Sequence, residues 1–131
     1  MASGSTVYFQ IFDAAASPTF NVVSATISAV NKNPGTGRAN SPFSGSVWST
    51  GTVVATSTPS GPNGTQLNGP FNGTSSVGCN VSGKCWNVGP FTVGNFNGQK
   101  FEITINVLTK DSQQDQKTFT VDPEMVVGEG K

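Results

Sequence analysis

The sequence predicts an all-β protein, an antiparallel two-sheet sandwich of the immunoglobulin-like or jelly-roll-like kind, with about seven to nine short strands and no substantial helix. Three observations lead to this fold class. Apolar and polar residues alternate in several short blocks, as they do in half-buried strands. No window shows apolar residues at the spacing of three and four that a helix needs. Turn sequences rich in Gly, Pro and Asn separate the blocks.

The composition agrees with a single folded domain over residues 1–131. Gly, Ser, Thr and Asn make up 58 of the 131 residues, and only 11% of the residues are charged, against about 25% in an average soluble domain. Disorder is the other interpretation of such a composition. The nine Phe, the two Trp and the blocks of β-branched residues favour an ordered β protein with long polar loops.

The strands are expected within residues 7–12, 20–30, 46–57, 86–93, 100–108 and 116–122. In the second of these, the residues predicted to share one face are Val23, Ala25, Ile27 and Ala29. In the fifth, the predicted inward residues are Phe101, Ile103, Ile105 and Val107. The last two strands are predicted to form a hairpin in which Phe119 and Val121 continue this inward face.

Several features are predicted to interrupt the regular strands. Gly51 indicates a bulge or a corner, and Gly89-Pro90 argues against a continuous central strand. Residues 56–78 are expected to form a long polar loop, and residues 125–131 a fraying tail. Pro-Phe occurs three times, at residues 42–43, 70–71 and 90–91. We expect each of these Phe rings to pack into the rim of the core.

The two cysteines, Cys79 and Cys85, enclose five residues that include Gly83. A tight hairpin would place the two cysteines opposite one another, with their sulfur atoms facing. Their Cα atoms would then lie roughly 5.5–6 Å apart, which is the separation that a disulfide needs. The alternative is a pair of unpaired thiols in a reducing compartment. Metal binding is disfavoured, because the chain has no histidine and two thiolates do not complete a zinc site.

The charge and residue inventory argues against several functions. Seven acidic residues balance seven basic ones, so no net positive charge attracts nucleic acid or anionic lipid. Without histidine the commonest general base is missing, so neither an enzyme nor a cofactor is expected. No apolar run is long enough to span a membrane. No signal peptide is visible, which leaves a cytoplasmic protein or a mature secreted form without its leader.

A calcium site near Asp111–Glu124 is a separate hypothesis. Four acidic residues lie there, at positions 111, 115, 122 and 124, and oxygen ligands suit Ca²⁺. Their spacing matches no EF-hand loop. A solvated polar loop is the simpler interpretation.

The function that the sequence favours is non-catalytic binding of a neutral glycan or glycoconjugate, as in a lectin, through loops at one end of the sandwich. Amides and hydroxyls match the hydrogen-bonding groups of a sugar, and an aromatic ring can pack on its C–H face. The predicted ligand-binding residues are Trp86, Asn87, Asn80, Lys84, Asn72, Asn95 and Asn97. For Trp86 the alternative is packing in the core of a sandwich, and for Trp48 core packing is favoured.

Two alternatives stay open. One is a structural subunit of a filament, capsid or secretion assembly, because low charge suits lateral packing into a homo-oligomer. In that case the segment TVYFQIF at residues 6–12 is a central strand or a strand donated to a neighbour. The other is a small toxin or defence protein that binds surface glycans.

Overall fold

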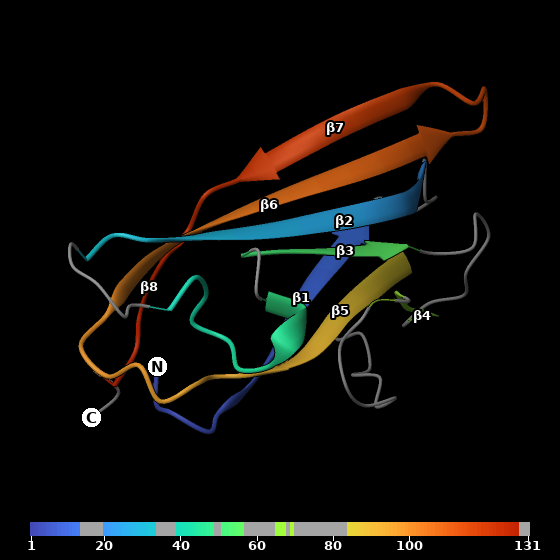
Figure 1. The fold of residues 1–131 in the computed structure, drawn as a ribbon. Coiled ribbons are helices and arrows are strands. Elements are labelled where there is room, and N and C mark those ends of the chain that lie inside the picture. The colour runs from blue at the N-terminus through green and yellow to red at the C-terminus, as the bar shows by residue number, and fades with distance from the viewer. Residues whose placement is uncertain are drawn as a thin grey trace.

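The computed structural model describes residues 1–13, 20–33, 39–48, 51–56, 65–67, 69 and 84–128, and within these it is an all-β sandwich of two sheets. The larger sheet has the order β3-β2-β6-β7, and β8 also pairs with β6. The smaller sheet has the order β1-β5-β4. The strands are β1 (Thr6–Asp13), β2 (Phe20–Asn31), β3 (Thr52–Thr56), β4 (Thr65–Gln66), β5 (Lys84–Thr92), β6 (Lys100–Asp111), β7 (Gln116–Val121) and β8 (Glu124–Val126). This arrangement (Figure 1) confirms the predicted fold class.

Strand pairing is antiparallel except between β4 and β5, which run parallel. The part of the chain described contains no α-helix; its helical element is the short 3₁₀ turn η1 (Ser46–Trp48). In the region where one strand was expected, residues 46–57, the described residues form the turn η1 followed by the shorter strand β3. Gly51, which precedes β3, has a φ of 77°. The chain thus turns a corner at this glycine, as its position predicts.

Strand β6 organises the larger sheet. Its inward residues Phe101, Ile103, Ile105 and Val107 are all buried, which confirms the predicted alternation. On one side it pairs with β2. On the other it pairs first with β7 and then with β8 in one unbroken register, since Ile105 lies opposite Val121 and Glu102 opposite Glu124. The segment from β7 to β8 is therefore one long outer strand, interrupted only at residues 122–123.

The inward face of β2 differs from the prediction. Val22, Ala25 and Ile27 are buried, whereas Val23 is only partly buried. The register with β6 shifts between Val22 and Ser24. This extra residue in one strand is a β-bulge, and it reverses the alternation on its far side. The predicted set was wrong at Val23 because strict alternation does not foresee a bulge.

The smaller sheet also differs from the prediction. Strand β5 runs continuously through Gly89-Pro90, and it lies between β1 and β4. The argument against a continuous central strand was wrong. Val7 of β1 pairs with Phe91, and Phe9 pairs with Val88. Tyr8 alone therefore lies opposite two residues of β5. A bulge in β5 therefore holds Gly89 and Pro90, and this is where a sheet tolerates such residues. The peptide bond between them is cis.

An aromatic cluster fills the core near the N-terminal end of β1. The rings of Phe43 and Phe91 lie 5.2 Å apart, and Trp48 lies 5.2 Å from Phe43 and 5.3 Å from Phe91. Phe9 contacts the cluster at 6.1 Å from Phe43. Phe43, Phe91 and Trp48 are buried, so the core-packing predictions are confirmed for these three. Phe71 lies outside the described residues.

Strand β7 does not extend the core. Phe119 and Val121 are 53% and 57% exposed, so their predicted inward role was wrong. Figure 1 shows the reason, because β7 lies at the outer margin of the larger sheet, away from β1 and β5. The two residues have the orientation expected from alternation, but none of the described strands of the smaller sheet lies opposite them.

The C-terminal segment is more ordered than predicted. Residues 124–126 form β8, Met125 packs against the core and Val127 is buried. Residues 125 and 126 of the expected fraying tail thus pair with β6, and Val127 lies in the core, contacts that the sequence did not indicate. Within the predicted loop 56–78, the structure describes the end of β3, β4, the buried Leu67 and residue 69. The rest of that loop lies outside the described residues.

Candidate functional site

The two central members of the predicted sugar site are buried. Trp86 and Asn87 are both 0% exposed. The Trp86 ring stacks on Phe20, with centroids 5.9 Å apart and planes 19° apart. The Asn87 Oδ1 atom accepts a hydrogen bond of 2.8 Å from the Gln10 side-chain amide. This burial speaks against the predicted ligand-binding role of both residues. Strand β5 is buried on both faces, so alternation does not expose every second side chain.

Asn95 and Asn97 are exposed, but they lie at the other end of the molecule. They belong to the connection between β5 and β6, which leads into the first residue of β6. Trp86 instead stacks on Phe20, and Phe20 pairs with Asp111, the last residue of β6. The twelve residues of β6 span roughly 36 Å at the rise of an extended strand. The predicted convergence of these asparagines with Trp86 in one site does not occur.

The other predicted residues belong to the cysteine segment or its neighbourhood. Asn72, Asn80 and Cys79 lie outside the described residues. The backbone of Lys84 begins β5 and pairs with Asp13. Cys85 is buried and forms a disulfide. Cys79 is the other cysteine in the sequence, so the disulfide fits the predicted staple.

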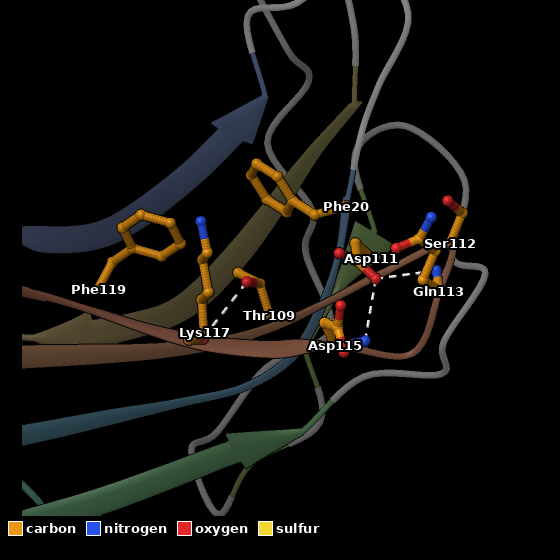
Figure 2. Close-up of a pocket in the computed structure, with 8 residues that line it drawn as sticks. All are labelled: Phe20, Thr109, Asp111, Ser112, Gln113, Asp115, Lys117 and Phe119. Atoms are coloured by element: carbon orange, nitrogen blue, oxygen red, sulfur yellow. Dashed lines mark hydrogen bonds between the residues drawn. The ribbon is translucent and has the colours of Figure 1, made fainter.

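A hollow of about 540 Å³ lies at the end of the larger sheet where β6 turns into β7. We call it the hairpin hollow. Its lining residues are Phe20, Thr109, Asp111, Ser112, Gln113, Asp115, Lys117 and Phe119. Figure 2 shows these side chains, which come from β2, from both strands of the hairpin and from its turn.

Two aromatic rings form the apolar part of the hollow. The Phe20 and Phe119 ring centroids lie 6.4 Å apart. Phe20 is held by its stacking on Trp86 in the core, whereas about half of the Phe119 side chain is exposed. Lys117 is two residues before Phe119, on the same face of β7, and in Figure 2 its side chain rises between the two rings. The hollow exists because the smaller sheet leaves this part of the larger sheet uncovered.

The polar part of the hollow is a turn organised by Asp111. Its Oδ1 atom accepts hydrogen bonds from the backbone N–H groups of Gln113, at 2.8 Å, and Asp115, at 2.9 Å. The backbone N–H of Gln114 donates to the Asp111 carbonyl at 3.1 Å, and the N–H of Asp111 donates to the Asp115 carbonyl at 3.0 Å. This is a three-residue hairpin loop with its last residue in the left-handed region. The turn therefore holds the side chains of residues 112–115 in defined places.

Gln114 occupies that left-handed position with a φ of 66°, and this gives a first testable prediction. Residues other than glycine pay about 1 kcal/mol or more for this conformation. We expect Gln114→Gly to raise the free energy of unfolding by about 0.5–1 kcal/mol, measured by urea denaturation. Gln113→Gly is the control, since Gln113 has no positive φ, and it is expected to be neutral or destabilising. A loss of stability in Gln114→Gly would contradict the assignment.

The structure does not gather the acidic residues proposed for calcium. Glu124 forms an ion pair with Lys100, with 2.9 Å between Oε2 and Nζ. Asp111 and Asp115 line the hollow, where one oxygen of Asp111 already accepts two backbone hydrogen bonds. Within the described ranges, no three Asp, Glu, Cys or His side chains lie close enough together to hold a metal ion.

A second hollow, of about 310 Å³, lies over the aromatic cluster. Its lining includes Phe43 and Trp48, which are both buried, and the partly exposed Phe96. It carries no charged side chain. The hairpin hollow therefore offers a ligand more exposed aromatic surface and more varied polar chemistry.

Sequence reasoning missed Phe20 and Phe119 as site residues. Both lie on strands whose positions the sequence predicted, but the buried face was mispredicted at Val23 and at Phe119, which was assigned to the core. The available signal was the polar turn TKDSQQD at residues 109–115, flanked by strands whose aromatic residues share one face. Only the extent of the smaller sheet shows that this face is open to solvent at the turn.

No protein-family model, curated protein or solved structure matches the chain. In the described residues, no helix is both long and apolar enough to cross a membrane.

Proposed function

We propose that the protein is a non-catalytic binding module for a neutral glycan and that the hairpin hollow is its binding site. The observation that carries the proposal is that one hollow is lined by the half-exposed Phe119, by Lys117 and, at its turn end, by Gln113. Its volume of about 540 Å³ lies within the range of about 300–1,000 Å³ that is usual for small-molecule sites.

Each part of the hollow has a role in this proposal. The Phe119 ring packs against the apolar C–H face of a sugar, and Phe20 extends this surface inward. Lys117 donates hydrogen bonds, Asp115 accepts them, and Gln113 does both. Sugar hydroxyls are donors and acceptors at once, so they match this mixed set.

Two features support binding without catalysis. The sequence has no histidine, which removes the commonest acid or base. Two carboxyl groups line the hollow, but Asp111 directs one oxygen to the backbone of its own turn. Hydrolysis of a glycoside requires two carboxyl groups that flank the bond to be cleaved, and Asp111 serves the turn instead.

The test is a titration of the protein with a panel of neutral mono- and oligosaccharides, followed by NMR chemical shifts. We expect a member of the panel to shift resonances of residues 109–119 selectively. Phe119→Ala is expected to weaken its binding about tenfold, which is the scale of a lost ring contact of about 1.4 kcal/mol. Because Phe119 is half exposed, this variant should keep its melting temperature within a few degrees.

Val121→Ala is the matched control. Val121 is on the same face of β7 and is exposed to a similar degree, yet it does not line the hollow. It should bind the glycan as tightly as the wild type. Binding that survives Phe119→Ala, or a panel in which no sugar shifts these resonances, would overturn the proposal.

A further inference from the structure

The outer side of β7 is an open hydrogen-bonding edge. The Asp111 N–H donates to the Asp115 carbonyl at 3.0 Å, and the Ile103 N–H donates to the Pro123 carbonyl at 2.8 Å. Hydrogen bonding alternates along an antiparallel strand, so the odd-numbered residues of β7 direct their backbone groups toward β6. The backbone groups of Gln116, Thr118 and Thr120 therefore point away from the sheet.

This outer edge is covered along β8 and open along β7. Along β8, the ammonium group of Met1 donates to the Val126 carbonyl at 2.7 Å, and the Gly128 N–H donates to the Met1 carbonyl at 2.7 Å. Along β7, no strand formed by the described residues pairs on the outer side. Figure 1 shows the N-terminus far from β7, at the opposite end of the long outer strand.

Strand β7 carries only one of the devices that protect most edge strands. Natural edges carry proline, several charges or a bulge. Between Gln116 and Val121 the chain has one charge, Lys117, and no proline. The register with β6 continues through β7 without a shift. The strand is therefore straight enough to pair, and Phe119 and Val121 on one face have apolar surface left to cover.

We propose that β7 pairs antiparallel with β7 of a second copy of this chain, across a two-fold axis that passes beside Phe119. In this register Phe119 lies opposite its own copy and Thr118 opposite Thr120. Lys117 then lies opposite Val121 and Gln116 opposite Asp122. The larger sheets of the two copies become one continuous sheet through the outward backbone groups of β7.

The segment is complementary to itself, and this is why a second copy is the partner. The sequence TFT at residues 118–120 reads the same in both directions, so an antiparallel pair matches Thr with Thr and Phe with Phe. Such cross-strand pairs stabilise sheets. No charged residue faces a like charge, and the chain has no net charge to keep copies apart.

The proposed axis places Phe119 at a non-hydrogen-bonded position, where side chains approach most closely. The two Cα atoms are then about 4.5 Å apart, within the range that a disulfide spans. The pairing would also bring the two hairpin hollows together on one side of the joined sheet. The proposed pairing of β7 does not depend on whether those hollows bind a glycan.

Cysteine cross-linking tests this register directly. We expect Phe119→Cys to form a disulfide-linked dimer under mild oxidation, seen by non-reducing electrophoresis and located by mass spectrometry. Val121→Cys is the control, since its own copy lies four residues away along the paired strand, roughly 13 Å. Its cross-linking should be at least about tenfold slower. Equal rates for the two variants would overturn the proposal.

Sedimentation equilibrium tests the association without a cross-link. The wild type is expected to show a concentration-dependent monomer–dimer equilibrium. Thr118→Pro removes an outward N–H while leaving the bonds to β6, so it should keep the fold and weaken self-association at least about tenfold, because two symmetric bonds are lost. Thr118→Ala keeps that N–H and should associate nearly as the wild type does. A wild type that stays monomeric at all concentrations, or a Thr118→Pro variant that associates normally, would refute the pairing.

Discussion

Trp86→Ala is expected to lower the free energy of unfolding by about 3–5 kcal/mol, the usual cost of removing a fully buried tryptophan. Trp86 is completely buried and stacks on Phe20. Its removal leaves a cavity beneath the hairpin hollow, and the Phe20 ring loses its support. Urea denaturation followed by circular dichroism measures the effect.

Trp86→Phe is the informative companion to this variant. The indole Nε1 of Trp86 is buried, and among the described residues it has no hydrogen-bond partner. Leaving such a group unpaired costs about 1–3 kcal/mol. Phenylalanine removes the unpaired N–H and keeps a ring against Phe20, so we expect it to lie within about 1.5 kcal/mol of the wild type. If Trp86→Ala were as stable as Trp86→Phe, the core role of this residue would be disproved.

The same two variants distinguish a role of Trp86 in core packing from a role in glycan binding. Under the proposed function, Trp86→Phe should retain glycan binding at the hairpin hollow, because the new ring still supports Phe20. A folded Trp86→Phe variant that loses binding at least tenfold would return Trp86 to the list of ligand contacts.

Gly89→Ala is the second change with a large expected effect, a loss of about 3 kcal/mol or more. Gly89 has a φ of 135°, and a Cβ added there would lie 2.8 Å from the Val7 carbonyl oxygen of the neighbouring strand. The backbone strain costs about 1–3 kcal/mol. Relief of the contact requires β1 and β5 to move apart, which costs about 1–3 kcal/mol more. Thermal denaturation should show a lowering of the melting temperature by ten degrees or more.

Gly98→Ala provides a matched control for this experiment. Gly98 also has a positive φ, of 79°, but a Cβ added there meets no atom within 4 Å. Gly98→Ala should lower the free energy of unfolding by about 1–2 kcal/mol, because only the strain of the positive φ applies there. Equal losses in the two variants would show that the close approach of β1 to β5 at Gly89 is not what restricts this position.

Predictions from local patterns succeeded where one strand face is buried and the strand is regular. The alternation in Phe101, Ile103, Ile105 and Val107 indicates an inward face, and all four are buried. Phe43, Phe91 and Trp48 were assigned to the core from their turns and strands, and they form one cluster. These features depend on nearest neighbours along the chain, so the sequence contains them.

The errors occurred at bulges and at the margins of the sheets. The bulge in β2 buries Val22 in place of Val23, and the bulge in β5 accommodates Gly89-Pro90. Both require knowledge of the partner strand. Whether Phe119 is core or surface depends on how far the smaller sheet reaches, and no residue near Phe119 in the sequence carries that information.

The sequence alone therefore determined the class of the fold, most of its strands and the neutral, histidine-free chemistry available to it. The tertiary structure determined which surfaces are open: it buried Trp86 and Asn87, separated Asn95 and Asn97 from them, and exposed Phe119 in the hollow that the turn at Asp111 also lines. The physical reason is that alternation specifies on which face of a strand a side chain lies. Exposure depends on whether a second layer covers that face, and contacts between residues distant in sequence establish that layer.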